Sequence, residues 1–124
     1  MPPTMNPHES QSIVEIRTTF GTRADAEACA ARLVTLRLAA CVQVDGPVSS
    51  TYRWQSAVEV AEEFRCTCKT TGERADACIE ALTAGHPYQT PEVIRAEVRA
   101  STAYAGWVRA SVAADCGHDG EQGR

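Results

Sequence analysis

Two long β-forming stretches, separated by a few residues, decide the fold. Residues 39–54 read Ala-Ala-Cys-Val-Gln-Val-Asp-Gly-Pro-Val-Ser-Ser-Thr-Tyr-Arg-Trp, and residues 58–70 read Val-Glu-Val-Ala-Glu-Glu-Phe-Arg-Cys-Thr-Cys-Lys-Thr. The first stretch is a strand with a bend at residues 45–47. In the second, apolar and polar side chains alternate from Phe64 onward, which is typical of an antiparallel strand with one buried face. A short turn near Gln55-Ser56 joins the two stretches into a hairpin.

This hairpin is too long for a small sheet. At about 3.3 Å per residue, strands over residues 41–54 and 58–70 span about 40 Å each, roughly twice the usual strand length. The excess carries Tyr52 and Trp54 and should protrude from the domain. Because an exposed aromatic ribbon favours pairing with another chain, the sequence predicts a homo-oligomer.

The segment before the hairpin predicts a strand followed by a helix. Residues 13–20 are rich in β-branched side chains, which favours a strand. Thr22 and Asp25 have the spacing of a capping box, so we expect a helix over residues 23–38.

The segment after the hairpin predicts the same pair of elements in the opposite order. Thr70 and Glu73 again have capping-box spacing, and the second helix should end at residues 85–87, since proline disfavours helix in the residue before it. Residues 93–98 predict a strand, and Ser101 caps a last short helix.

The predicted order is β-α-β-β-α-β, an α+β fold of the ferredoxin-like kind, with a short C-terminal helix. The domain covers residues 12–113, and residues 1–11 and 114–124 are expected to be flexible tails because they are rich in proline, glycine or polar residues.

Length and charge exclude several classes of protein. A chain of 124 residues forms one domain, and 12 basic against 16 acidic residues give a net charge of −4. This charge argues against sequence-independent nucleic-acid binding, which depends on phosphate neutralisation. The sequence has no apolar run of membrane-spanning length and no visible secretory signal, so we expect a cytoplasmic protein that does not bind membranes.

The six cysteines suggest a disulfide or zinc domain, but their spacing does not support one. No Cys-x-x-Cys pair occurs, although structural zinc sites are usually built on such pairs. Strand and helix phasing instead predicts core packing for five of them: Cys29, Cys41, Cys66, Cys68 and Cys78. Cys116 lies in the C-terminal tail, where it forms Cys-x-His with His118 and could bind a soft metal adventitiously.

Five short motifs occur in the order and spacing of a known family. They are Leu38-Ala-Ala-Cys-Val42, Tyr52-Arg-Trp54, Lys69-Thr-Thr71, His86-Pro-Tyr-Gln-Thr-Pro-Glu92 and Tyr104-x-x-Trp107. On these motifs the chain resembles the divalent-cation tolerance protein CutA. The resemblance implies a ferredoxin-like subunit, a homotrimer like that of the PII signalling proteins, a link to tolerance of copper and other divalent metals, and metal binding in some members.

The chain departs from the family pattern where metal ligands are implied. Arg17 stands where some members carry a cysteine, and Gly85 stands where some carry the first of two adjacent histidines. The usual Glu-Gly of the hairpin turn is Gln55-Ser56 here. A copper site therefore cannot be carried over whole from the family.

His86 is the candidate metal ligand, because a neutral imidazole suits copper or zinc. The alternative is a structural role at the end of the second helix, where the helix dipole favours a histidine. A second candidate site is a cleft between subunits, whose alternative is a plain oligomer interface rich in aromatic residues and arginine. Its candidate residues are Tyr52, Arg53, Trp54, Glu59, Glu63, Lys69, Tyr88 and Trp107.

The sequence gives no support for an enzyme. It has no glycine-rich phosphate loop and no recognisable nucleophile motif, and the one asparagine, Asn6, lies in the tail, which argues against an acylphosphatase. Two hypotheses remain: a trimeric metal-tolerance protein that binds a divalent ion such as copper, or a PII-like signalling or scaffold trimer that holds a small ligand or a protein partner in its clefts.

Overall fold

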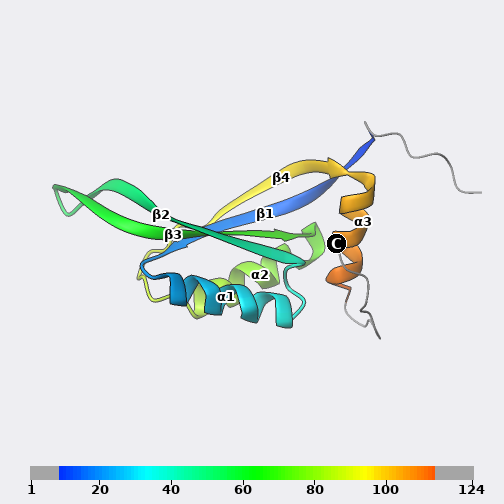
Figure 1. Ribbon diagram of the computed structural model, residues 1–124, viewed down its shortest axis with the longest axis horizontal. Coiled ribbons are helices and arrows are strands. Elements are labelled where there is room, and N and C mark those ends of the chain that lie inside the picture. Colours follow the sequence, from blue (N-terminus) through cyan, green and yellow to red (C-terminus); the bar gives the residue numbers. More distant parts are fainter. Residues whose placement is uncertain (1–8, 114–124) are drawn as a thin grey trace, which may run out of the picture.

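The computed structural model describes residues 9–113, and the predicted tail residues 1–8 and 114–124, with Cys116, lie outside the described residues. The elements follow the predicted order (Figure 1). They are β1 (Ser10–Phe20), α1 (Arg23–Thr35), β2 (Cys41–Trp54), β3 (Ala57–Thr70), α2 (Gly72–Ala84), β4 (Ile94–Ser101) and α3 (Thr102–Ser111).

The strands form one antiparallel sheet in the order β2-β3-β1-β4. Figure 1 shows α1 and α2 side by side on one face of this sheet, with α3 at the end where β4 finishes. None of the helices in residues 9–113 is long and apolar enough to cross a membrane.

The main core lies between the sheet and the two helices. Every second residue of β1 from Val14 and of β3 from Phe64 points into it, and Ile16, Cys66 and Cys68 are completely buried there. The helices contribute Leu33 and Leu82, which are equally buried. The alternation predicted for β3 is therefore confirmed.

A second, smaller cluster attaches α3 to the sheet. Ile13 points away from the main core and packs with Ala105 and Val108 of α3, while Tyr104 and Trp107 cover the edge of this cluster. Ser101 caps α3 as predicted, because its hydroxyl accepts the Tyr104 N–H at 3.1 Å.

Predicted boundaries need correction in three places. β1 begins at Ser10 and β4 runs on to Ser101, past the predicted end at residue 98, because residues 10 and 11, which we assigned to the tail, pair with Ser101 and Ala100 of β4. α1 ends at Thr35 and not at residue 38, because the N–H groups of residues 38 and 39 turn back to the carbonyl of Leu33.

The third correction concerns the cap of α2. The cap is Thr71, whose hydroxyl accepts the Arg74 N–H at 3.3 Å. Thr70, which we predicted to start the helix, is buried in the sheet and donates its hydroxyl to the Leu38 carbonyl at 2.7 Å.

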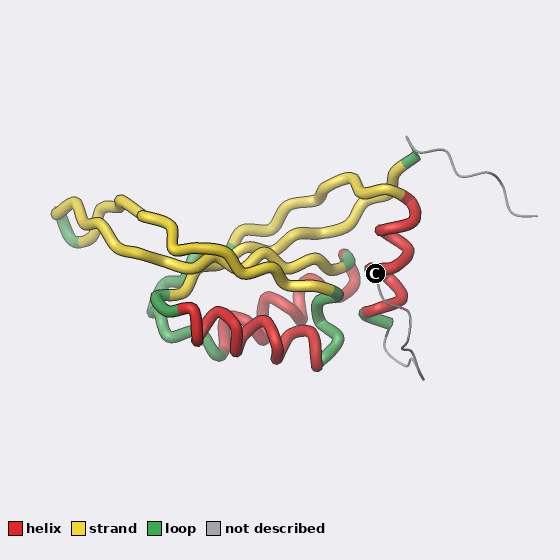
Figure 2. The backbone as a smooth tube through the Cα atoms, viewed as in Figure 1, coloured by secondary structure: helices red, strands yellow, loops and turns green. Residues whose placement is uncertain are grey.

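The hairpin is the longest feature of the fold, as Figure 2 shows, and it runs well past the helices. A β-bulge divides it, because Asp45 pairs with Arg65 but the next pair is Val48 with Glu63. We call residues 48–63 the overhang, and the paired residues 41–45 and 65–69 the root. The bulge confirms the bend predicted at residues 45–47.

Gly46 makes the bulge possible. Its φ of +145° is a conformation that side chains other than hydrogen rarely allow, and a Cβ atom there would lie 2.8 Å from the Phe64 ring. The chain therefore needs glycine at this position, both for backbone conformation and for space.

Candidate functional site

The overhang presents apolar side chains on both of its faces. Tyr52 and Trp54 lie on one face and are 42% and 51% exposed, and Val58 and Val60 lie on the other and are each 66% exposed. Neither face is covered by the helices of the same subunit. Exposure of such apolar faces to water costs free energy, and another protein surface that covers them removes this cost.

Charged candidates accompany these apolar residues. Glu59 pairs with Tyr52 in the register and shares its face, whereas Arg53 pairs with Val58 on the opposite face. All four side chains are exposed in the single subunit.

At the base of the overhang, Glu63 contacts the loop between α2 and β4. Its carboxylate accepts the Tyr88 hydroxyl at 2.9 Å. Burial and the neighbouring Glu63 carboxylate raise the pKa of Tyr88 to about 12. Tyr88 therefore stays protonated and able to donate this hydrogen bond at neutral pH.

His86 lies just behind Tyr88, at the end of β1. Its Nδ1 accepts the backbone N–H of Tyr88 at 3.1 Å, and its Nε2 lies 2.9 Å from the Thr19 carbonyl oxygen and 3.2 Å from the Thr18 hydroxyl. The imidazole also stacks on Phe20, with 4.3 Å between ring centroids. Burial lowers the pKa of His86 more than its Thr19 hydrogen bond and the nearby Asp25 and Glu63 raise it.

These contacts do not fit a metal centre within one subunit. Both ring nitrogens of His86 are hydrogen-bonded to atoms of this chain, so a metal ion would have to displace one of them. Among residues 9–113, no three histidine, cysteine, aspartate or glutamate side chains come together as a set that could hold a metal ion.

An arginine side chain lies at each of the two positions where the family pattern implied other ligands: Arg17 stands at the first, and Arg32 lies over Gly85 at the second. Arg17 donates to Glu15 at 2.9 Å. A Cβ atom on Gly85 would lie 2.7 Å from the guanidinium of Arg32, which crosses this residue to donate to the Ala81 carbonyl. A histidine at position 85 would therefore require the Arg32 guanidinium to move away from its present position.

Arg32 and Gly85 also line a cavity of about 170 Å³ between α1 and the loop after α2. Asp25 and Cys29 complete its polar lining.

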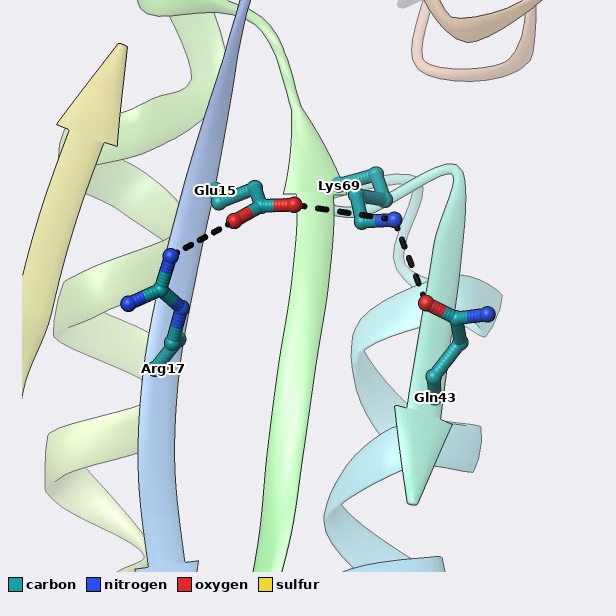
Figure 3. A network of polar contacts seen from close by, with 4 residues as sticks. All are labelled: Glu15, Arg17, Gln43 and Lys69. Carbon is teal, nitrogen blue, oxygen red and sulfur yellow. Dashed lines mark hydrogen bonds and ion pairs between the residues drawn. The ribbon is translucent and has the colours of Figure 1, made fainter. Parts of the chain in front are cut away.

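Lys69 lies on the open face of the sheet, away from the overhang. Figure 3 shows its ammonium group between Glu15 and Gln43, at 3.7 Å and 3.1 Å, with Arg17 on the other oxygen of Glu15. Lys69 and Glu15 are only 16% and 19% exposed. The network is half-buried on the face opposite α1 and α2, the same face on which α3 packs against Ile13.

The predicted cleft residues thus fall into separate groups within one subunit. Glu63 and Tyr88 meet at the base of the overhang, whereas Lys69 is six residues further along β3, about 20 Å away at the strand's rise. The Trp107 ring contacts the Tyr104 ring at a tilt on α3, at the opposite end of the sheet. A cleft that combines these groups requires more than one subunit.

Four of the cysteines behave as small apolar side chains. Cys29, Cys66, Cys68 and Cys78 are buried, without disulfides, in the main core. Burial raises the pKa of Cys29 and raises that of Cys66 to about 12, and a hydrogen bond to Cys78 raises that of Cys68. Cys41 is only half-buried on β2, where it pairs with Lys69 and lies outside the main core, so the core role predicted for it is wrong. The core role predicted for the four buried cysteines is confirmed.

Sequence reasoning missed several residues of these clusters. Glu15 and Gln43 belong to the Lys69 network, and the alternation of polar residues along β1 was the signal that could have found Glu15. Thr18, Thr19 and Phe20, which hold His86, lie at least 66 residues away from it in sequence and carry no local signal.

The fold and the site define an α+β subunit of the ferredoxin-like class that projects an apolar ribbon from its sheet. Residues 14–111 match the model of the CutA1 divalent ion tolerance protein family, and the chain belongs to this family. The divalent-cation tolerance protein CutA of Escherichia coli O139:H28 is 34% identical over 100 residues, which cover 80% of this chain and 89% of that protein.

Solved structures agree with this assignment. CutA from Xylella fastidiosa superposes with a TM-score of 0.79 at 34% identity, covering 82% of this chain and 98% of that one. CutA from Synechococcus elongatus PCC7942, solved in complex with a Bis-Tris molecule, gives 0.76 at 34% identity, covering 83% and 97%. The fold and family expected from the sequence are therefore confirmed.

Proposed function

We propose that this chain serves divalent-cation tolerance as a homotrimer whose intersubunit clefts bind a small ligand. The observation that carries the proposal is the overhang, whose four large apolar side chains are 42–66% exposed in the single subunit. The cytoplasmic location and the absence of catalysis expected from the sequence remain predictions.

The exposure of both ribbon faces supports a closed assembly of several subunits. A dimer contact on Tyr52 and Trp54 alone would leave Val58 and Val60 in water. A cyclic trimer, in which each ribbon lies between its neighbours, covers both faces.

The composition of the overhang supports a ligand cleft at the same interface. Tyr52 and Glu59 share one face, with Glu63 and Tyr88 at its base, so an aromatic wall adjoins acidic groups. This chemistry suits a small cationic or polyhydroxylated molecule. The Synechococcus elongatus relative was solved with Bis-Tris, a compound of this class.

A second candidate function is direct binding of a divalent metal such as copper, which the family's description favours. The donors would have to come from more than one subunit, because the described residues of a single subunit provide no set of three. His86 would contribute only by giving up a hydrogen bond.

Light scattering tests the assembly. We expect a mass of three subunits at micromolar concentration and an unfolding midpoint that rises with protein concentration. A monomer mass, or a midpoint independent of concentration under reversible conditions, would contradict the homotrimer.

Calorimetric titration separates the two functions. Cu²⁺ is titrated into the wild type, His86→Ala and a chain that ends at residue 113, which removes Cys116 and His118. Saturable binding that is lost in His86→Ala and kept in the shortened chain would favour the metal function. Saturable binding of Bis-Tris that Tyr52→Ala weakens, with no specific Cu²⁺ binding, would favour the small-ligand cleft.

A further inference from the structure

The end of β1, the loop after α2 and the base of the overhang meet at His86 and Tyr88. The His86 ring packs on Phe20 with an angle of 13° between the ring planes. Its two nitrogens contact backbone groups from different elements, the Thr19 carbonyl in β1 and the Tyr88 N–H in the loop.

These partners define the tautomer of His86. A backbone N–H only donates, so Nδ1 must accept and carries no proton. A carbonyl only accepts, so Nε2 carries the proton and donates it to Thr19. The neutral ring is thereby fixed in position and in orientation.

Tyr88 connects the fixed His86 ring to the hairpin, because its backbone N–H bonds to His86 and its side chain bonds to Glu63. Its hydroxyl donates to Glu63, and Glu63 with Val48 forms the first residue pair of the overhang beyond the bulge. A single side chain thus connects the loop to the point at which the overhang leaves the sheet.

A second tether holds the same point from α1. Arg23 donates to the Gly46 carbonyl at 3.0 Å and lies over the Phe64 ring, 5.0 Å from its centroid. The bulge is therefore held from the start of α1 and from the loop after α2.

We infer that His86 is a positioning residue which, through Tyr88 and Glu63, fixes the base of the overhang and so the surface that it offers to neighbouring subunits. The part concerning neighbouring subunits rests on the proposed homotrimer. The part concerning the overhang holds for the single subunit.

A matched pair of variants separates the two bonds of His86. Asparagine places an amide oxygen near the position of Nδ1 and can still accept the Tyr88 N–H, whereas glutamine extends its amide toward the position of Nε2. Both lose the stack on Phe20. In hydrogen exchange measured by mass spectrometry, we expect His86→Gln and Tyr88→Phe to speed exchange in residues 48–63 about three- to tenfold. His86→Asn keeps the bond to the Tyr88 N–H but loses the bond to Thr19, so it should speed exchange less than His86→Gln.

Nitrogen NMR of the His86 ring provides a direct readout of the tautomer. We expect the Nε2–H form near neutral pH, with no shift when Zn²⁺ is added at one equivalent per subunit. An Nδ1–H tautomer, or a shift on addition of Zn²⁺, would overturn the inference.

A double variant tests whether His86 acts through Tyr88. If it does, His86→Gln adds no further exchange in residues 48–63 once Tyr88 is phenylalanine, whereas a general structural role would give additive effects. Additivity, or wild-type exchange in Tyr88→Phe, would refute the inference. Tyr88→Phe removes one hydroxyl only, so it stays informative if a His86 variant fails to fold.

The result is distinguishable from a failure of the proposed function. If the wild type is a monomer by light scattering, the homotrimer is wrong, while the exchange and NMR data still decide the role of His86. If the wild type is a trimer and the Tyr88→Phe trimer dissociates at the same dilution as the wild type, then the Tyr88 bond does not affect subunit association. The part of the inference that concerns neighbouring subunits is then wrong.

Discussion

The root and the overhang are built from the same two strands, yet their side chains meet opposite surroundings. In the root, Cys66 and Cys68 are completely buried beneath the helices. In the overhang, Val58 and Val60 continue the same alternation on β3 and are 66% exposed. The root is covered within one chain, whereas the overhang is left exposed by its own chain. We therefore expect folding to depend on the first and assembly on the second.

The largest effect should come from the helical layer over the root. Leu82→Ala removes a completely buried side chain, and we expect a loss of about 2–5 kcal/mol in the free energy of unfolding. Leu36→Ala is the matched control, because Leu36 is 54% exposed and its truncation should cost less than about 0.5 kcal/mol. Urea denaturation at one fixed protein concentration measures both. Equal losses of unfolding free energy in Leu82→Ala and Leu36→Ala would contradict the conclusion that folding depends on the buried side chains over the root.

The next effect should appear in assembly and leave the fold intact. Val60→Asp places a charge on the exposed ribbon, where it stays hydrated in the single subunit but would be buried without a partner in the proposed trimer. We expect subunit association to weaken by about a hundredfold, or about 2.7 kcal/mol, with unchanged circular dichroism.

Val34→Asp is the control for this substitution, because Val34 is 42% exposed on α1 and lies outside the hairpin. Light scattering over a dilution series compares the two variants. If both dissociate alike, or neither does, the overhang is not the assembling surface.

The sequence predicted the root and the overhang well because both depend on local patterns. The alternation of apolar and polar side chains from Phe64 onward is visible in consecutive residues, and the length of each strand follows from its number of residues. The cap of α2 was placed one residue early because Thr70 and Thr71 are chemically alike, and only the sheet decides which of them is buried.

The candidate site could not be predicted to the same extent. His86 was found as a chemical type, but its role depends on Thr19 and Phe20, which reach it only through the fold. Likewise, nothing near Gly85 in the sequence indicates that Arg32, on another helix, lies over it. Contacts between residues distant in sequence decide which atoms of a functional group remain free to bind a ligand, and these contacts cannot be read from a single sequence.

A smaller loss of stability is expected where Arg32 of α1 donates a hydrogen bond to the Ala81 carbonyl of α2. In Gly85→Ala, the new methyl group would displace the Arg32 guanidinium from the Ala81 carbonyl, which it contacts at 2.7 Å. We expect a loss of about 1 kcal/mol, since the bond is exposed to solvent. Thermal unfolding measures it.

Gly72→Ala is the matched control, because a Cβ atom there meets nothing within 4 Å and alanine favours the helix. It should leave stability unchanged or raise it slightly. Similar losses in both variants would show that Arg32 does not need glycine beside it.

The smallest effect concerns pH and the residue that joins the two regions. Burial lowers the pKa of His86 below the ordinary 6.5, so between these two values the unfolded chain binds more protons than the folded one. The contribution of neutral His86 to stability is therefore complete above about pH 6.5 and is lost as the pH falls through the lowered pKa. Protonation of Nδ1 would also remove the acceptor for the Tyr88 N–H.

We expect the wild type to lose more stability than His86→Gln when the pH is lowered from about 7.5 to about 5, a window that spans the ordinary histidine pKa. Urea denaturation of both chains at each pH measures the difference, and His8 and His118 cancel because both chains contain them. Parallel pH profiles would mean that folding does not change the proton affinity of His86. In that case burial of the ring beside Phe20 would not disfavour its charged form, and pH would not act through His86 on the connection between the root and the overhang.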